Sequence, residues 1–131
     1  MKNQNSNIDY TVTFSFSEND LNKFASLSGD YNKIHNDINY CKSKGFNNLV
    51  VYGGLIISKI SKYIGMNFIH SDIIWSSLEI NFISPAFIEE KLIMHINQER
   101  YFDDINFHLM NFEIKMNIAK IADGNFIIKK I

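Results

Sequence analysis

One carboxylate and one imidazole stand five residues apart in a segment that is unable to stay helical. The segment, residues 24–37, reads FASLSGDYNKIHND, and the two groups are Asp30 and His35. Gly29 favours a helix end, so an irregular loop should follow it. Such a loop can direct both side chains at one small volume and hold a water molecule there for deprotonation. Taken alone, the same spacing is more often a turn with a capping carboxylate and a solvated imidazole.

A pair of glycines opens the most apolar segment of the chain, LVVYGGLIISKISKYIG at residues 49–65. Its apolar residues form a broad helical stripe: Leu55, Ile56, Ile60, Tyr63 and Ile64. This pattern predicts a mostly buried helix that begins near Gly53. Gly53 and Gly54 have no side chains, so a ligand can come close to the free N–H groups of the first helical turn, where the potential is positive. The pair therefore indicates an oxyanion site, or else a tight turn packed under strands.

The elements that must position these groups are read from periodicity. Residues 10–16 alternate with a period of two, which predicts a first strand. Ser17 should cap a helix that ends at Gly29, so the helix delivers Asp30 to its C-terminal exit. A short helix should start at Asn36 or Asp37 and end at Gly45.

The second half of the chain predicts strands. Leu92, Met94 and Ile96 alternate up to an Asp103-Asp104 turn. A clean alternation follows over residues 110–118, and Asp123-Gly124 is expected to turn the chain into a last strand at residues 125–131. Together these elements predict an α+β protein in which the helix at residues 51–65 covers an antiparallel sheet with one apolar face.

Composition limits the classes of function. The 131 residues fit one domain, 1–131, and 13 Lys and Arg against 14 Asp and Glu leave no basic excess for nucleic acid. No apolar stretch is long enough to span a membrane, and the single cysteine, Cys41, fits a reducing compartment, so we expect a cytoplasmic protein. No second ligand stands at metal spacing from His70, His95 or His108, so no metal site is expected.

Three segments resemble the family of MaoC-like dehydratases and (R)-specific enoyl-CoA hydratases. FASLSGDYNKIHND is similar to the family's loop Ala-x-x-Ser/Thr-Gly-Asp-x-Asn-Pro-x-His-x-Asp, with Asp, Asn and His in register. VVYGGLIISKIS resembles the family's Ile-Val-His-Gly-Met helix start, and LEINFISPAFIEEKL resembles its Phe-x-x-Pro-Val strand. Together these segments cover residues 24–92.

The resemblance implies a single hot-dog fold, a curved antiparallel β-sheet wrapped around a long central helix, with active sites in homodimers. It implies a lyase of fatty acid metabolism that interconverts trans-2-enoyl and (R)-3-hydroxyacyl thioesters of coenzyme A or an acyl carrier protein, without a cofactor. Asp30 and His35 would then be catalytic and activate one water. The N–H of Gly53 would polarise the thioester carbonyl, while Ser61 and Tyr52 would be substrate-binding residues.

Five positions depart from the family's pattern. Lys33 replaces a proline, Tyr52 a histidine and Gly54 a methionine, while Glu89-Glu90 replace Gly-Asp. These changes keep open a second interpretation, a non-catalytic subunit that binds acyl thioesters or acts as a scaffold. A hot-dog thioesterase is a weaker third, because thioester hydrolysis would normally place a carboxylate on the central helix.

Overall fold

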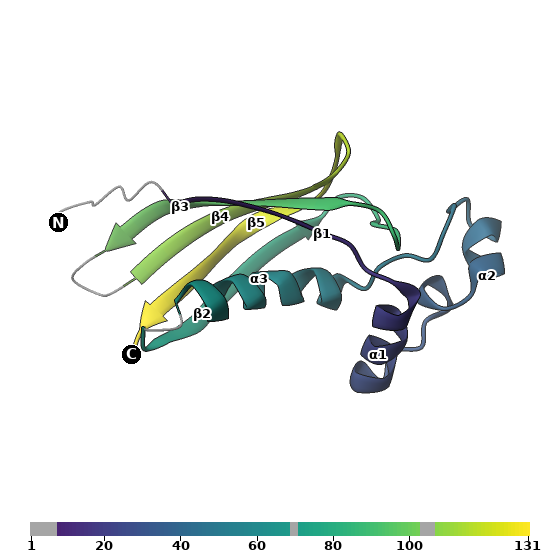
Figure 1. Cartoon of the computed structure of the whole chain (residues 1–131), viewed down its shortest axis with the longest axis horizontal. Coiled ribbons are helices and arrows are strands. Elements are labelled where there is room, and N and C mark those ends of the chain that lie inside the picture. Colours follow the sequence, from purple (N-terminus) through teal and green to yellow (C-terminus); the bar gives the residue numbers. More distant parts are fainter. Residues whose placement is uncertain (1–7, 69–70, 103–106) are drawn as a thin grey trace.

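The computed structural model describes residues 8–68, 71–102 and 107–131, and its main feature is a five-stranded sheet along one long helix (Figure 1). The strands are β1 (Asp9–Phe14), β2 (Ile73–Phe82), β3 (Leu92–Phe102), β4 (Phe107–Met116) and β5 (Ala119–Lys130). All pairings are antiparallel in the order β1-β3-β4-β5-β2, so β1 and β2 are the edges of an open sheet. The predicted α+β class is confirmed.

The helices α1 (Glu18–Ser28), η1 (Lys33–His35) and α2 (Ile38–Ser43) gather near the first residues of the long helix α3 (Gly53–Asn67) (Figure 1). The predicted cap of α1 is confirmed: the Asp20 N–H donates to Ser17 Oγ at 3.2 Å, and the Ser17 N–H donates to Asp20 Oδ2 at 2.9 Å. These hydrogen bonds lower the pKa of Asp20. Gly29 ends the helix at φ 78°, a left-handed conformation that glycine adopts at little cost.

Helix α3 buries its apolar stripe against the inner face of the sheet. Ile60 is fully buried, and the Tyr63 ring lies 6.2 Å from Phe126 of β5 and 4.8 Å from Tyr10 of β1, measured between centroids. A fully buried side chain of this size contributes about 1.5–3 kcal/mol to the free energy of unfolding. The helix therefore has a fixed position, and so does its first turn.

The predicted turn at Asp123-Gly124 is wrong. The chain turns instead at residues 117–118, where Asn117 has a φ of 54°, and β5 runs straight through Gly124. Gly124 faces Ile80 of β2 and Phe112 of β4 in the ladder. Asn117 accepts the left-handed conformation because its short polar side chain tolerates it, and the glycine at 124 serves a close strand approach instead. The predicted Asp103-Asp104 turn and His70 lie outside the described residues.

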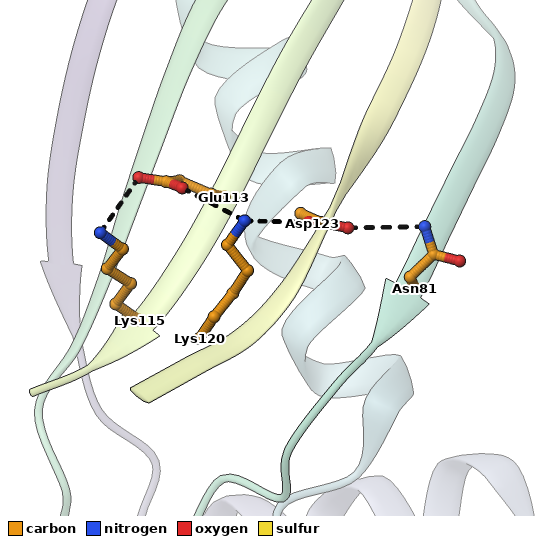
Figure 2. A network of polar contacts seen from close by, with 5 residues as sticks. All are labelled: Asn81, Glu113, Lys115, Lys120 and Asp123. Atoms are coloured by element: carbon orange, nitrogen blue, oxygen red, sulfur yellow. Dashed lines mark hydrogen bonds and ion pairs between the residues drawn. The ribbon is translucent and has the colours of Figure 1, made fainter. Parts of the chain in front are cut away.

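The outer face of the sheet is polar. Figure 2 shows a network on the face away from α3: Lys120 Nζ lies 3.1 Å from Asp123 Oδ2 and 3.7 Å from Glu113 Oε2. The network continues to Lys115 and to Asn81. The contact with Lys120 lowers the pKa of Asp123. Because these groups are partly exposed, such pairs add little stability, and their main effect is to keep this face solvated.

No helix within the described ranges is long and apolar enough to cross a bilayer. Cys41 is fully buried beside η1, and its Sγ donates to the Ile34 carbonyl oxygen at 3.0 Å. Cys41 is therefore a small buried hydrophobe rather than an exposed nucleophile.

The half-buried His108 of β4 should make the protein less stable in mild acid. Its Nδ1 lies 2.8 Å from Gln98 Oε1, its ring stacks on Tyr101 at 4.4 Å, and burial lowers its pKa below the ordinary 6.5. Below pH 6.5 His108 is protonated in the unfolded chain but stays neutral in the folded protein. The free energy of unfolding therefore falls as the pH drops from 6.5 through the lowered pKa of His108. We expect the urea midpoint to fall between about pH 7.5 and 5, and less so in His108→Gln. An equal fall in both proteins would contradict this.

Candidate active site

The loop that carries Asp30 is held by a series of short-range hydrogen bonds. The Asp30 N–H donates to Ser28 Oγ at 3.1 Å, the Asn32 N–H donates to Asp30 Oδ1 at 3.0 Å, and the Ile34 N–H donates to Asn32 Oδ1 at 3.2 Å. Such side-chain turns rigidify a loop without proline. They explain how the segment keeps its shape with Lys33 in place of the family's proline.

His35, the last residue of η1, is fixed by a backbone carbonyl. Its Nδ1 lies 2.6 Å from the Val50 oxygen. A carbonyl oxygen only accepts, so Nδ1 carries the proton, and in the neutral ring Nε2 is an acceptor. Within the part of the chain that the structure describes, no hydrogen-bond partner occupies this nitrogen. The Nε2 atom of His35 is thus available to accept a proton.

Tyr52 links the backbone of Asp30 to the imidazole of His35. Its side chain is only 2% exposed, its hydroxyl donates to the backbone oxygen of Asp30 at 2.6 Å, and its ring stacks on His35 at 3.8 Å. Burial raises the pKa of Tyr52 above 10.0, and the Asp30 carboxylate raises it further. The hydroxyl therefore remains a donor over the whole physiological range.

A pocket of about 400 Å³ lies where His35 meets the start of α3. Gly53, the first residue of that helix, is part of its wall, and the Tyr52 side chain does not cap the helix. The N–H groups of Gly53 and Gly54 thus have no hydrogen-bond acceptor among the described residues. The other wall residues are mostly apolar: Val50, Val51, Ile56, Phe82, Ile83, Ser84, Pro85 and Ala86. The pocket thus combines an imidazole, the free N–H of Gly53 and a mostly apolar wall.

The structure brings together three of the five predicted site residues: His35 and Gly53 line the pocket, and Tyr52 stacks on His35. Asp30 lies on the exposed loop, where the Tyr52 hydroxyl donates to its backbone oxygen, and its side chain does not line the pocket. Ser61 is exposed on α3, more than two turns beyond Gly53, and does not line this pocket. The roles given to all five residues remain predictions.

Sequence reasoning missed the two groups that hold the site residues in place. The Val50 carbonyl orients His35, and the Phe24 ring packs on Tyr52 with 4.7 Å between centroids. A backbone carbonyl leaves no signal in residue types, because every residue has one. Phe24 is visible in the sequence only as part of the apolar face of α1.

A larger hollow of about 490 Å³ lies on the outer face of the sheet. Its wall includes His95, Glu113, Lys120 and three asparagines, Asn97, Asn111 and Asn125. None of the predicted site residues lines it, and the network of Figure 2 forms part of its wall. Within the described ranges, no group of three His, Cys, Asp or Glu side chains could hold a metal ion. We therefore place the candidate site at His35.

Comparisons with known proteins identify the family and the fold. The sequence model of the MaoC like domain matches residues 2–116. A mitochondrial 3-hydroxyacyl-[acyl-carrier-protein] dehydratase of Arabidopsis thaliana is 26% identical over 113 residues, which cover 83% of this chain and 67% of the relative.

Solved structures show the same fold. An (R)-hydratase of A. caviae involved in PHA biosynthesis superposes with a TM-score of 0.87 at 20% identity, over 95% of this chain and 96% of the other. An R-hydratase of Pseudomonas aeruginosa, in its unliganded form, gives 0.84 at 23% identity, over 95% and 80%. The predicted hot-dog fold is confirmed.

Proposed function

The chain belongs to the MaoC-like domain family, and from this premise we propose that it interconverts trans-2-enoyl and (R)-3-hydroxyacyl thioesters. The observation that carries the proposal is the His35 ring, fixed by the Val50 carbonyl and facing a pocket that begins at the first turn of α3. The similar Arabidopsis dehydratase acts on an acyl carrier protein thioester, and the solved relatives are (R)-hydratases. Coenzyme A and carrier-protein thioesters are both substrates of the proposed class.

In hydration, Asp30 and His35 bind and activate one water. The pair accepts a proton from the water, and His35 Nε2 is the free acceptor for it. The water oxygen forms a bond to C3 of the enoyl chain, and the C2=C3 electron pair moves toward the thioester. The accepted proton then goes to C2, so the atoms balance without a cofactor. Dehydration runs the same steps backwards.

The negative charge that develops on the thioester oxygen must be stabilised by a hydrogen-bond donor. In the proposed reaction the Gly53 N–H is that donor, because it stands at the uncapped start of α3, where the helix dipole adds positive potential. The first turn of α3 carries no acidic residue that would compete for it. Because position 53 has no side chain, the substrate carbonyl can come close to this N–H.

We propose that the working form is a homodimer. Strand β2 is an edge of the sheet, and Ile74 and Phe82 in it and Ile83 just after it are about half exposed, at 53%, 51% and 54%. A ten-residue edge strand with exposed apolar side chains is a natural surface for pairing with a second chain. We expect light scattering to give twice the chain mass, and Ile74→Lys to lower it. A wild-type mass of one chain at micromolar concentration would contradict the proposal.

The reaction is tested by incubating the purified protein with short- and medium-chain trans-2-enoyl-CoAs and following the loss of the conjugated double bond by absorbance. We expect loss of the signal and formation of the (R)-3-hydroxyacyl product. Binding of these thioesters without turnover at any chain length would overturn the proposal in favour of the non-catalytic acyl-binding subunit.

A further inference from the structure

We propose that Tyr52 is a positioning residue that holds the Asp30 loop and the His35 ring at a fixed separation, and that Phe24 and Gly54 keep Tyr52 in place. This inference rests on the proposed function and deepens it. It gives Tyr52 a role behind the reacting groups instead of the direct substrate contact that the sequence predicts.

The contacts of Tyr52 leave little of it for a substrate. Its hydroxyl donates to the Asp30 carbonyl oxygen at 2.6 Å, one face stacks on His35 at 3.8 Å, and the side chain is 2% exposed. It does not line the 400 Å³ pocket, whereas its neighbours Val51 and Gly53 do. A buried donor with a short hydrogen bond fixes its acceptor, and here the acceptor belongs to the residue that carries the acid.

Phe24 and Gly54 explain why a tyrosine fits at this position. The Phe24 ring packs on Tyr52 with 4.7 Å between centroids and an angle of 47°. A Cβ on residue 54 would lie 2.4 Å from Phe24 Cζ, far closer than two carbons can approach. Any side chain at position 54 would therefore displace the Phe24 ring from its present position.

Two departures from the family's pattern thus belong to one packed unit. Tyr52 stands where the family has a histidine, and Gly54 stands where it has a methionine. The missing side chain at 54 makes room for Phe24, and Phe24 covers the ring of Tyr52. Tyr52, Phe24 and Gly54 thus pack together beside the loop that carries Asp30.

Tyr52→Phe removes the hydroxyl and keeps the ring, so it separates positioning from packing. We expect kcat to fall by about tenfold with KM changed by less than about twofold, because a loosened Asp30 loop misplaces the acid but not the substrate. Tyr63→Phe is the matched control: it removes a second buried tyrosine hydroxyl, on α3 and outside the site, and should leave kcat unchanged.

Two other results for Tyr52→Phe would contradict the proposal. A raised KM with unchanged kcat would mean that Tyr52 touches the substrate. A lower melting temperature with both constants unchanged would mean that the residue is only structural.

A readout without substrate keeps this inference separate from the proposed reaction. In the wild-type protein the Tyr52 ring current should shift the His35 ring protons upfield in the NMR spectrum. Tyr52→Phe should preserve the shift, and Tyr52→Leu should remove it. If the protein turns over no enoyl thioester but shows these shifts, the reaction fails and the geometric part of the inference stands. If Tyr52→Leu leaves the His35 signals in place, the inference fails whatever the activity.

Discussion

Replacing Asp30 by Asn should lower the turnover of an enoyl thioester by roughly two to four powers of ten while the fold remains intact. The substitution removes the negative charge that, in the proposed mechanism, helps to activate water. It keeps an oxygen in the position where Asp30 Oδ1 accepts the Asn32 N–H at 3.0 Å, so the turn that shapes the loop survives. The measurement is kcat with the best enoyl-CoA, together with the melting temperature of both proteins.

Asp37→Asn is the matched control for this prediction. Asp37 also accepts a backbone N–H through its carboxylate, that of Tyr40 at 3.0 Å, but it caps α2 and does not line the pocket. Asparagine caps a helix about as well as aspartate, so neither kcat nor stability should change much. If Asp30→Asn kept the wild-type rate, Asp30 would have no part in the mechanism.

The local parts of the site were predictable because short-range chemistry determines them. Ser17 and Gly29 mark the two ends of α1 through hydrogen bonds and backbone conformation within a few residues, and the structure has both. The start of α3 at Gly53 follows equally from the apolar stripe that begins there. Since Asp30 comes directly after α1, its place on a loop followed from the end of that helix.

The contacts between distant segments were not predictable from residue types. The Tyr52 hydroxyl bonds to a carbonyl 22 positions earlier, and the ring of His35 bonds to one 15 positions later. Nothing in the types of Asp30 or Val50 indicates these partners, because backbone oxygens are the acceptors. The wrong turn at Asp123-Gly124 has the same origin. An Asp-Gly pair favours a turn locally, but here Gly124 lies within β5, where it allows β2 to approach closely.

That neighbouring strand leads to the largest stability effect that we expect. In Gly124→Ala the new Cβ would lie 1.9 Å from the Glu79 backbone oxygen and 3.0 Å from the Ile80 Cα. Both atoms belong to the backbone of β2, so no side-chain rotation relieves the clash, and β2 must move away from β5. We expect the free energy of unfolding to fall by about 3 kcal/mol or more, at the upper end of overpacking effects. Equilibrium urea unfolding measures it.

Gly65→Ala also adds one methyl group, but it should raise the free energy of unfolding instead of lowering it. Gly65 lies in α3, and its added Cβ would meet nothing within 4 Å, so the substitution should stabilise the protein by up to about 1 kcal/mol through helix propensity.

The displacement of β2 in Gly124→Ala should also reduce enoyl-CoA turnover, because Phe82 at the end of β2 is part of the pocket wall. Equal stability of the two variants would show that β2 and β5 do not approach each other this closely at Gly124.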